Sequence, residues 1–235
     1  MILTEDFMVQ TEKQMQKEKK KKRPVAKPYT LGEEIFNSVS HGVGAGLSIA
    51  ALVVLIVKAA LTGNAYMIVS ASIFGAMMIL LYTMSTLYHA LTNQTAKKVF
   101  RIFDHCTIFL LIAGTYTPYT LVTLHGAVGW TLFGILWGFA VLGIVFNAID
   151  LQRFKKVSVV CYIIMGWSIV FAIRPLLENL ALGGLIFLLA GGIFYTVGVV
   201  FYALKKIRYM HSIWHLFVLG GTICHFFSIL FWVIQ

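Results

Sequence analysis

The sequence predicts an all-α membrane protein, a bundle of seven transmembrane helices with the N-terminus in the cytoplasm and the C-terminus outside. Three observations predict this class. Of the 235 residues, 59% are apolar and only 12% are charged, the charges are absent from long windows, and the remaining charges cluster in alternate loops. Soluble domains are about half apolar and a quarter charged. A disordered chain and an ordinary soluble globule are therefore excluded.

Seven apolar segments approach the length that a helix needs to cross a bilayer, which is roughly 20 residues for a hydrocarbon core about 30 Å thick. Lipid requires the backbone polar groups of each segment to be satisfied within that segment, which favours helices. Alternation in segments of about ten residues, typical of a membrane barrel, is missing from the sequence. Turn signals at 62–64 and 124–126 divide the longest windows. The predicted spans are 41–61, 66–89, 102–123, 127–148, 157–174, 181–203 and 211–233.

Residues 1–31 are predicted to form a basic, disordered cytoplasmic tail that precedes a transmembrane domain at 32–235. Lys and Arg dominate residues 13–23, and Pro24 and Pro28 follow. A signal peptide is excluded because no short apolar region with a small-residue cleavage site follows the basic run. We interpret the tail as an anchor near anionic lipid rather than as a nucleic-acid-binding segment.

The positions of the cations predict the orientation, because cytoplasmic loops collect Lys and Arg. All but two of the 19 Lys and Arg residues lie in the tail or in the loops after the second, fourth and sixth spans. The exceptions are Lys58, predicted to snorkel outward from the first span, and Arg174 at the end of the fifth. An odd number of spans with the N-terminus inside explains this pattern. We therefore expect a multi-pass protein of the cell (plasma) membrane.

Ionisable residues within spans are expensive and are candidates for function. The predicted topology places His89, Asp104, His211 and His215 in the cytoplasmic leaflet. His211 and His215 are four apart on one helix face, a spacing that lets two imidazoles bind one metal ion. Three His with an open position are typical of catalytic zinc. Asp104 could then orient or deprotonate a water that zinc activates, and Ser85 could hydrogen-bond that water or a substrate carbonyl.

Structural roles are the alternative for these residues. A single His-x3-His motif is a weak signal, and histidines at helix ends often face the membrane interface. Asp104 could instead pair with Arg101 or cap the third span. The occurrence of all the candidates in one leaflet favours the metal hypothesis.

The other polar and small residues of the spans are interpreted structurally. His225, deeper in the last span, is predicted to be a hydrogen-bonded interior His rather than a ligand. Glu34, Asn37 and His41 share one helix face and are predicted to pack or cap at the inner interface, with a cavity entrance as the alternative. Pro118 is predicted to bend the third span. Free thiols are expected at Cys106, Cys161 and Cys224. Close helix contacts are expected at Gly134, Gly138, Gly183, Gly184, Gly191 and Gly192.

Several motifs together resemble the progestin and adiponectin receptor family, and more closely its bacterial branch, the hemolysin III proteins. The resemblance covers about residues 32 to 235. It is carried by Ser85-x3-His89, Asp104 at the start of the third span, His211-x3-His215, the stretch from Glu34 to Gly42, and the stretch from Ala113 to Pro118.

The resemblance implies a zinc site with His89, His211 and His215 as ligands, Asp104 holding the activated water and Ser85 beside it. The wider superfamily includes alkaline ceramidases, which hydrolyse a lipid amide. The implied function is therefore that of a zinc-dependent hydrolase of lipid amides or esters. One alternative is a membrane-perturbing or pore-forming hemolysin. Another is a non-enzymatic regulator or receptor of membrane lipid state, and in both of these the zinc would be structural. Membrane lipids are the expected partners and Zn2+ the expected cofactor, with no nucleic acid bound.

Overall fold

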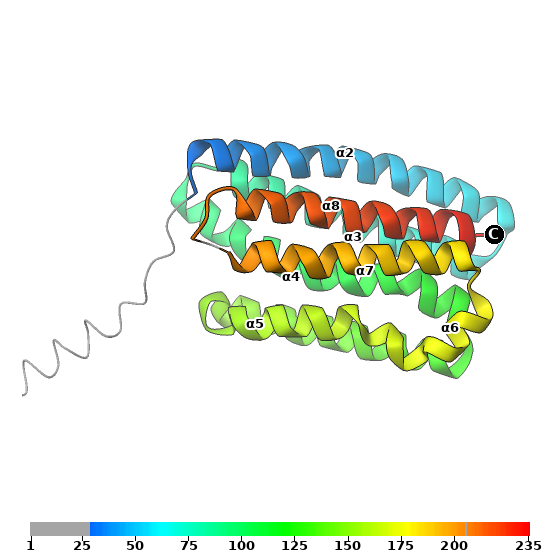
Figure 1. Cartoon of the computed structure of the whole chain (residues 1–235). Helices are drawn as coiled ribbons and strands as arrows, with labels where there is room; N and C mark the ends of the chain where they lie inside the picture. Colours follow the sequence, from blue (N-terminus) through cyan, green and yellow to red (C-terminus); the bar gives the residue numbers. More distant parts are fainter. Residues whose placement is uncertain (1–28, 205) are drawn as a thin grey trace, which may run out of the picture.

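The computed structural model describes residues 29–204 and 206–235, and every element within these ranges is helical (Figure 1). The predicted tail thus lies outside the described residues, apart from its last three. The elements are α2 (Leu31–Thr62), α3 (Ala65–Ala90), α4 (Gln94–Pro118), the π-helix η1 (Tyr119–Leu124), α5 (Gly126–Gly166), the 3-10 helix η2 (Ser168–Ala172), α6 (Ile173–Asn179), α7 (Leu182–Ala203), α8 (Met210–Ser228) and the π-helix η3 (Ile229–Val233).

Within the described ranges, six helical runs are long and apolar enough to cross a membrane, so the chain is a multi-pass membrane protein. They are Leu31–Thr62, Ala65–Ala90, Gln94–Leu124, Gly126–Asn179, Leu182–Ala203 and Met210–Val233. The two predicted spans 127–148 and 157–174 both fall within the run Gly126–Asn179.

Local capping signals explain where the helices begin and end. Thr30 forms a capping box with Glu33, so α2 begins at Leu31 rather than at the predicted residue 41. Gly63, with φ at 69°, ends α2 in a left-handed conformation that glycine adopts without strain. The side chains of Asn64 and Asn93 accept hydrogen bonds from the first backbone N–H groups of α3 and α4.

The polarity of α2 is inverted relative to a helix of a soluble protein. Asn37, His41 and Ser48 on its inner face are buried, whereas Val39 and Val53 on its outer face are exposed. Exposed apolar side chains are suited to contact with lipid, and buried polar ones find partners inside the bundle.

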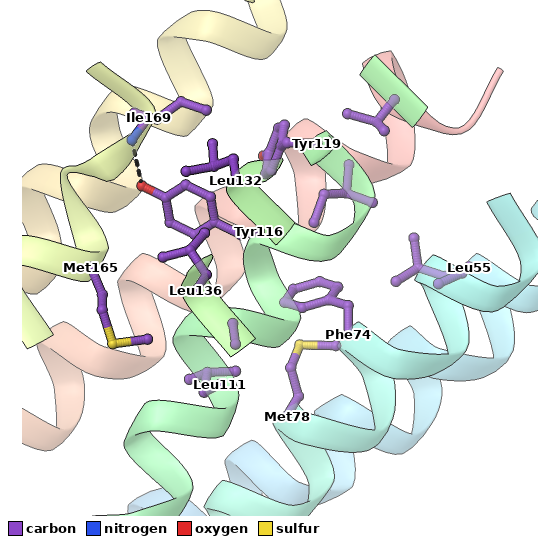
Figure 2. Packing of buried hydrophobic residues seen from close by; sticks show 14 of the residues in the cluster. Leu55, Phe74, Met78, Leu111, Tyr116, Tyr119, Leu132, Leu136, Met165 and Ile169 are labelled. Atoms are coloured by element: carbon purple, nitrogen blue, oxygen red, sulfur yellow. Dashed lines mark hydrogen bonds between the residues drawn. The ribbon is translucent and has the colours of Figure 1, made fainter. Parts of the chain in front are cut away.

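The run formed by α4 and η1 is the most buried of the six and lies at the centre of the bundle. Pro118 has no N–H to continue the α-helical ladder, and the helix changes there from α to π geometry. Figure 2 shows the core around this point. Tyr116 donates to the carbonyl of Gly166 (2.7 Å) and accepts from the backbone N–H of Ile169 (3.0 Å), which joins α4 to the end of α5 and the start of η2.

The long helix α5 is broken at Asp150, where φ and ψ are −157° and 89°. Contacts with α4 show that the two halves run in opposite directions. In the first half Trp137 contacts Thr117, whereas Gly143, further along the chain, faces Phe109. The second half follows α4 in the opposite sense, with Tyr162 bonded to His105 and Gly166 to Tyr116. The break therefore reverses the chain at one end of the bundle, at the left in Figure 1.

We call this end the basic end. It contains the start of α2, the link between α3 and α4, the Asp150 break and the link between α7 and α8. Glu33 and Glu34 connect these parts. The backbone N–H of Tyr209 donates to Oε1 of Glu33 (2.8 Å), and Lys97 pairs with Oε1 of Glu34 (2.7 Å).

Close helix contacts at glycine differ in part from the prediction. A Cβ atom would be met at under 3.0 Å at Gly183, Gly184 and Gly191, by Trp232, Leu180 and His225. The prediction is wrong for Gly134 and Gly138, where no atom lies within 4 Å, because both face outward from the bundle.

Candidate metal centre

Three imidazoles converge at the basic end from two helices. His89 lies in the last turn of α3, and His211 and His215 lie in the first two turns of α8. One nitrogen from each ring can be chosen so that all three atoms lie within 4.8 Å of one another. The Nε2 atoms of His211 and His215 are 3.2 Å apart, because the four-residue spacing stacks them on one helix face. The structure thus brings together the three predicted ligands.

The state of the His89 ring nitrogens is compatible with binding of a metal ion. Nε2 of His89 is buried and has no hydrogen-bond partner within the described residues, while the other ring nitrogen of His89 is engaged. An orphaned nitrogen in a buried site costs free energy unless it meets a proton donor or a cation. Three neutral imidazoles are a ligand set that zinc accepts, with a fourth position left open.

Glu34 orients the His89 ring from the first turn of α2. Its Oε2 lies 2.6 Å from Nδ1 of His89, and its Oε1 lies 2.7 Å from Nζ of Lys97. Nδ1 therefore donates to a carboxylate, which leaves Nε2 as the free lone pair. A carboxylate behind a histidine ligand is the arrangement that fixes the tautomer in metal sites. The sequence interpretation of Glu34 as a capping or packing residue missed this role.

Aromatic rings enclose the cluster. Tyr29 stacks on His211, with ring centroids 4.9 Å apart, and His41 stacks on His215 at 3.7 Å. Both ring nitrogens of His41 are buried without a partner in the described part of the chain. Burial raises the pKa of the Tyr29 hydroxyl above its usual range, so this phenol stays neutral beside the cluster.

Asp104 and Ser85 border the same cavity as His211 and His215, which has a volume of about 300 Å³. Oδ2 of Asp104 lies 3.4 Å from Nδ1 of His105, and the buried hydroxyl of Ser85 lies next to the Asp104 carboxylate. The two structural alternatives for Asp104 were capping of the third span and pairing with Arg101. Within the described residues Asn93 caps α4, and His105 is the basic residue that pairs with the Asp104 carboxylate.

The cavity extends from His211 and His215 along α8 to His225. Its walls come from α2, α3, α4, η1, the second half of α5, η2, α6, α7 and α8, and most of the lining side chains are apolar. As predicted, His225 is a hydrogen-bonded interior residue, with Nε2 3.2 Å from the carbonyl oxygen of Leu188. Cys106, Cys161 and Cys224 are free thiols, also as predicted.

Comparison with known proteins gives the family. The profile described as "Haemolysin-III related" matches residues 29–226. The chain belongs to the haemolysin-III related family. It is 51% identical over 202 residues to Hemolysin-3 of Bacillus cereus, covering 86% of this chain and 92% of that protein. It is 47% identical over 207 residues to the Hemolysin-3 homolog of Bacillus subtilis (strain 168), covering 88% and 97%.

A more distant relative is the human monocyte to macrophage differentiation factor, 26% identical over 171 residues, with 68% of this chain and 69% of that protein covered. The predicted hemolysin III resemblance is thus confirmed. The matched region of this haemolysin-III related protein begins at Tyr29 and includes the ring that covers His211.

The sequence interpretation identified three further residues of the site but did not place them beside the histidines. The set Glu34, Asn37 and His41 was recognised as one face of a helix, but not as the face behind the histidines. Asn37 accepts a hydrogen bond from Ser212 of α8 at 2.6 Å, which ties α2 to the helix that carries two of the three imidazoles. The signal in the sequence was the spacing of these polar residues, three and four apart within an apolar segment, which places them on one face of α2. A polar face on a membrane-spanning helix points into the bundle.

Proposed function

We propose that this haemolysin-III related protein is a zinc-dependent hydrolase of lipid esters or amides that works within the membrane. The observation that carries the proposal is the convergence of three imidazoles, one with a buried unpartnered Nε2, beside the carboxylate of Asp104 and the hydroxyl of Ser85. Apart from His89, these groups border an apolar cavity large enough for part of an acyl chain.

His89, His211 and His215 would hold the zinc ion, with Glu34 fixing the tautomer of His89. When bound, zinc acts as a Lewis acid that polarises an ester or amide carbonyl and makes water more acidic. The identity of the metal is part of the proposal. It is supported by the all-nitrogen donor set, because zinc prefers imidazole whereas Mg2+ and Ca2+ prefer oxygen.

Side chains of this protein would carry out proton transfer and bind the substrate carbonyl. A carboxylate oxygen of Asp104 would accept the proton of the attacking water and return it to the leaving alcohol or amine. The hydroxyl of Ser85, which is buried next to the Asp104 carboxylate, would donate to the substrate carbonyl oxygen as negative charge develops there. The apolar wall would exclude bulk water and hold the chain of the substrate, so that the carbonyl stays beside the polar groups.

The cavity also offers a route from the bilayer. Its wall is shared by residues of η2 and α6 on one side and of α7 on the other, and several of these residues are exposed at the outer surface of the bundle. They are Val170, Ile173, Leu177 and Leu189. A hydrogen bond from Nε1 of Trp167 to Thr196 (3.1 Å) bridges the two sides. A lipid could therefore enter sideways, without passing through water.

The topology is part of the proposal. The chain would cross the plasma membrane seven times, with its N-terminus in the cytoplasm and its C-terminus outside. The reversal at Asp150 supports seven passages, because it divides the run Gly126–Asn179 into two antiparallel segments. The cations that lie at the basic end support a cytoplasmic placement of the site.

Metal analysis and lipid turnover test the proposal in two steps. Purified protein is expected to carry about one zinc per chain and to lose it in His211→Ala, and zinc retained in that variant would contradict the ligand assignment. Asp104→Asn is expected to keep zinc but to lose turnover of a ceramide or phospholipid substrate. The control is Asp150→Asn, which changes a carboxylate at the α5 break and should turn over lipid as the unmodified protein does. Equal turnover in the Asp104 and Asp150 variants would contradict the catalytic part.

A membrane-perturbing activity is the second candidate, favoured by the name Hemolysin-3 of relatives at 47% and 51% identity. In that case the zinc would be structural. Dye release from liposomes separates the two functions. Release that persists in Asp104→Asn would favour membrane perturbation, whereas release that requires intact Asp104 would follow from lipid hydrolysis.

A further inference from the structure

A guanidinium group without a carboxylate partner lies at the basic end, one turn of α4 before Asp104. It belongs to Arg101, whose backbone carbonyl accepts from Nδ1 of His105 at 2.9 Å. None of the ion pairs among the described residues includes Arg101, and the Asp104 carboxylate pairs with His105 instead. Arg101 therefore keeps an uncompensated positive charge at this end of the bundle.

The Arg101 side chain is held in place by a neutral group. With the amide of Gln152 turned so that its oxygen faces α4, that oxygen accepts from Nη1 and Nη2 of Arg101 at 2.8 and 3.2 Å. Gln152 follows the break at Asp150, so the contact joins α4 to the second half of α5. An amide orients the guanidinium without neutralising it, and only two of the five N–H donors of the group are used in this contact.

Tyrosine rings connect Arg101 with the candidate metal centre. The guanidinium is close enough to Tyr88 and Tyr202 to act electrostatically on both phenols. The centroid of the Tyr88 ring lies 4.5 Å from that of His89. The centroid of the Tyr202 ring lies 6.0 Å from that of His211. Arg101 thus shares its aromatic neighbours with two of the three candidate zinc ligands.

Lys155 brings a second cation to the same side of the site. Its Nζ lies 5.8 Å from the centroid of the Tyr202 ring. Tyr202 borders the cavity, as does Asp104, one turn after Arg101. The end of the cavity that adjoins the metal centre is therefore flanked by two cations, whereas its remaining wall is mostly apolar.

This arrangement suits a lipid that carries a phosphate close to an ester. Arg101 precedes Asp104 by three residues, about 4.5 Å along the helix axis, and the phosphate of a glycerophospholipid is only a few bonds from its nearer ester carbonyl. A carbonyl beside Asp104, with its acyl chain in the apolar part of the cavity, would leave the phosphate beside Arg101. A guanidinium binds phosphate oxygens through two parallel hydrogen bonds. An uncharged lipid would leave the half-buried Arg101 without a counterion.

We propose that Arg101 recognises the phosphate group of a glycerophospholipid whose ester lies at the candidate metal centre, with Lys155 as a flanking charge. The inference rests on the proposed function for the presence of a lipid in the cavity, and it names the class of that lipid. It does not require turnover. Arg101 would contact the head of the lipid and not the reacting atoms, so its role is in specificity.

Binding of two lipids with the same acyl chains tests this role in the full-length protein, in neutral detergent micelles with zinc present. The probes are dioleoyl phosphatidic acid and dioleoylglycerol, which lacks the phosphate, and affinity is obtained from the lipid dependence of the thermal unfolding midpoint. We expect phosphatidic acid to bind about 10- to 100-fold more tightly, the gain from hydrogen bonds between charged groups. In Arg101→Gln this preference should fall below about threefold, with dioleoylglycerol binding unchanged.

Arg153→Gln is the matched control, because Arg153 is an exposed guanidinium next to Gln152 in the sequence. It should keep the full preference for phosphatidic acid. An equal loss in the two variants would indicate diffuse surface charge and would overturn the site at Arg101. If Arg101→Gln does not fold, Arg101→Lys decides the question. Lysine keeps the charge but not the planar fork, so an undiminished preference in that variant would overturn the proposal.

The remaining outcomes separate this inference from the proposed function. Equal binding of the two lipids by the unmodified protein would overturn the phosphate site and leave the lipid cavity standing, whereas binding of neither would overturn both. Glycerol 3-phosphate distinguishes a lipid head from free phosphate. Its affinity should be at least about 100-fold lower than that of phosphatidic acid, because it buries no acyl chain. An equal affinity would overturn the assignment to a lipid.

Discussion

Glu34 and His89 are 55 residues apart in the sequence, yet Oε2 of Glu34 lies 2.6 Å from Nδ1 of His89. This contact joins the first turn of α2 to the last turn of α3 and sets which nitrogen of His89 faces the cluster. The site therefore depends on a helix that contributes none of the three converging imidazoles.

Glu34→Gln tests this dependence. The amide keeps the shape but loses the charge that favours an N–H at Nδ1, and loss of such a partner costs about 10- to 100-fold in metal affinity. Zinc affinity, measured by competition with a chelator, should fall by that factor. Glu33→Gln is the matched control, because the hydrogen bonds of the Glu33 side chain within the described residues go to the cap residue Thr30 and to Tyr209. Its zinc affinity should be unchanged, and a loss equal to that of Glu34→Gln would contradict the orienting role.

Two histidines of α8 should respond differently to the same substitution. His215→Leu removes a predicted ligand and is expected to abolish zinc binding, whereas His225→Leu removes only the bond to the Leu188 carbonyl and should retain about one zinc per chain. Metal content of the purified variants, normalised to protein, gives the comparison. Loss of zinc in both variants, with both still folded, would show that the assignment of His225 is wrong.

Two glycines of the first half of α5 give a packing prediction. A Cβ atom at Gly143 would meet the Phe109 ring at 2.3 to 2.5 Å, whereas no atom lies within 4 Å of a Cβ atom at Gly138. Gly143→Ala should lower the free energy of unfolding by about 1–3 kcal/mol through overpacking. Gly138→Ala should leave it unchanged or raise it by up to about 1 kcal/mol, because alanine favours the helix. Thermal unfolding in detergent measures both.

Lys58 was predicted to snorkel outward, and its Nζ instead donates to the carbonyl of Leu230 in η3 at 2.6 Å. This bond ties α2 to the π-helical turn near the C-terminus. Lys58→Met keeps most of the aliphatic stem and should cost about 1–3 kcal/mol of unfolding free energy. The same substitution at the exposed Lys98 should change it by less than about 0.5 kcal/mol. Equal stability of the two variants would contradict the role of the bond.

The proposed orientation predicts which positions a membrane-impermeant thiol reagent can reach. In a variant that lacks the three natural cysteines, Gln235→Cys should be labelled in intact cells. Lys206→Cys, in the link between α7 and α8, should be labelled only after the cells are permeabilised. The reverse pattern would invert the topology, and labelling of both positions in intact cells would contradict the passage of α8 across the membrane.

The apolar windows of the sequence predicted where the helices lie, because bilayer thickness and backbone hydrogen bonding act on local composition. The predicted bounds 66–89 and 181–203 nearly coincide with α3 and α7. The residues of the candidate metal centre were also predictable in part, because the spacing of His211 and His215 alone puts both rings on one helix face. The stacking of His41 on His215 and the pairing of Glu34 with His89 were not, because they depend on the rotation of α2 against its neighbours. For the same reason, composition could not distinguish the outward-facing Gly138 from Gly143 at a helix contact.

The reversal at Asp150 also limits how the cavity wall can move. The segment that follows the break carries Trp167 and Leu177, and its connection to the first half of α5 contains no flexible loop. The far end of this segment is fixed as well, because only Leu180 and Ala181 separate α6 from α7. A wall segment held at both ends can bow away from α7 in its middle but cannot swing open at either end. On addition of lipid, the distance between spin labels at Val170 and Leu189 would therefore increase more than the distance between labels at Leu177 and Leu182, and equal changes at both pairs would contradict this bowing.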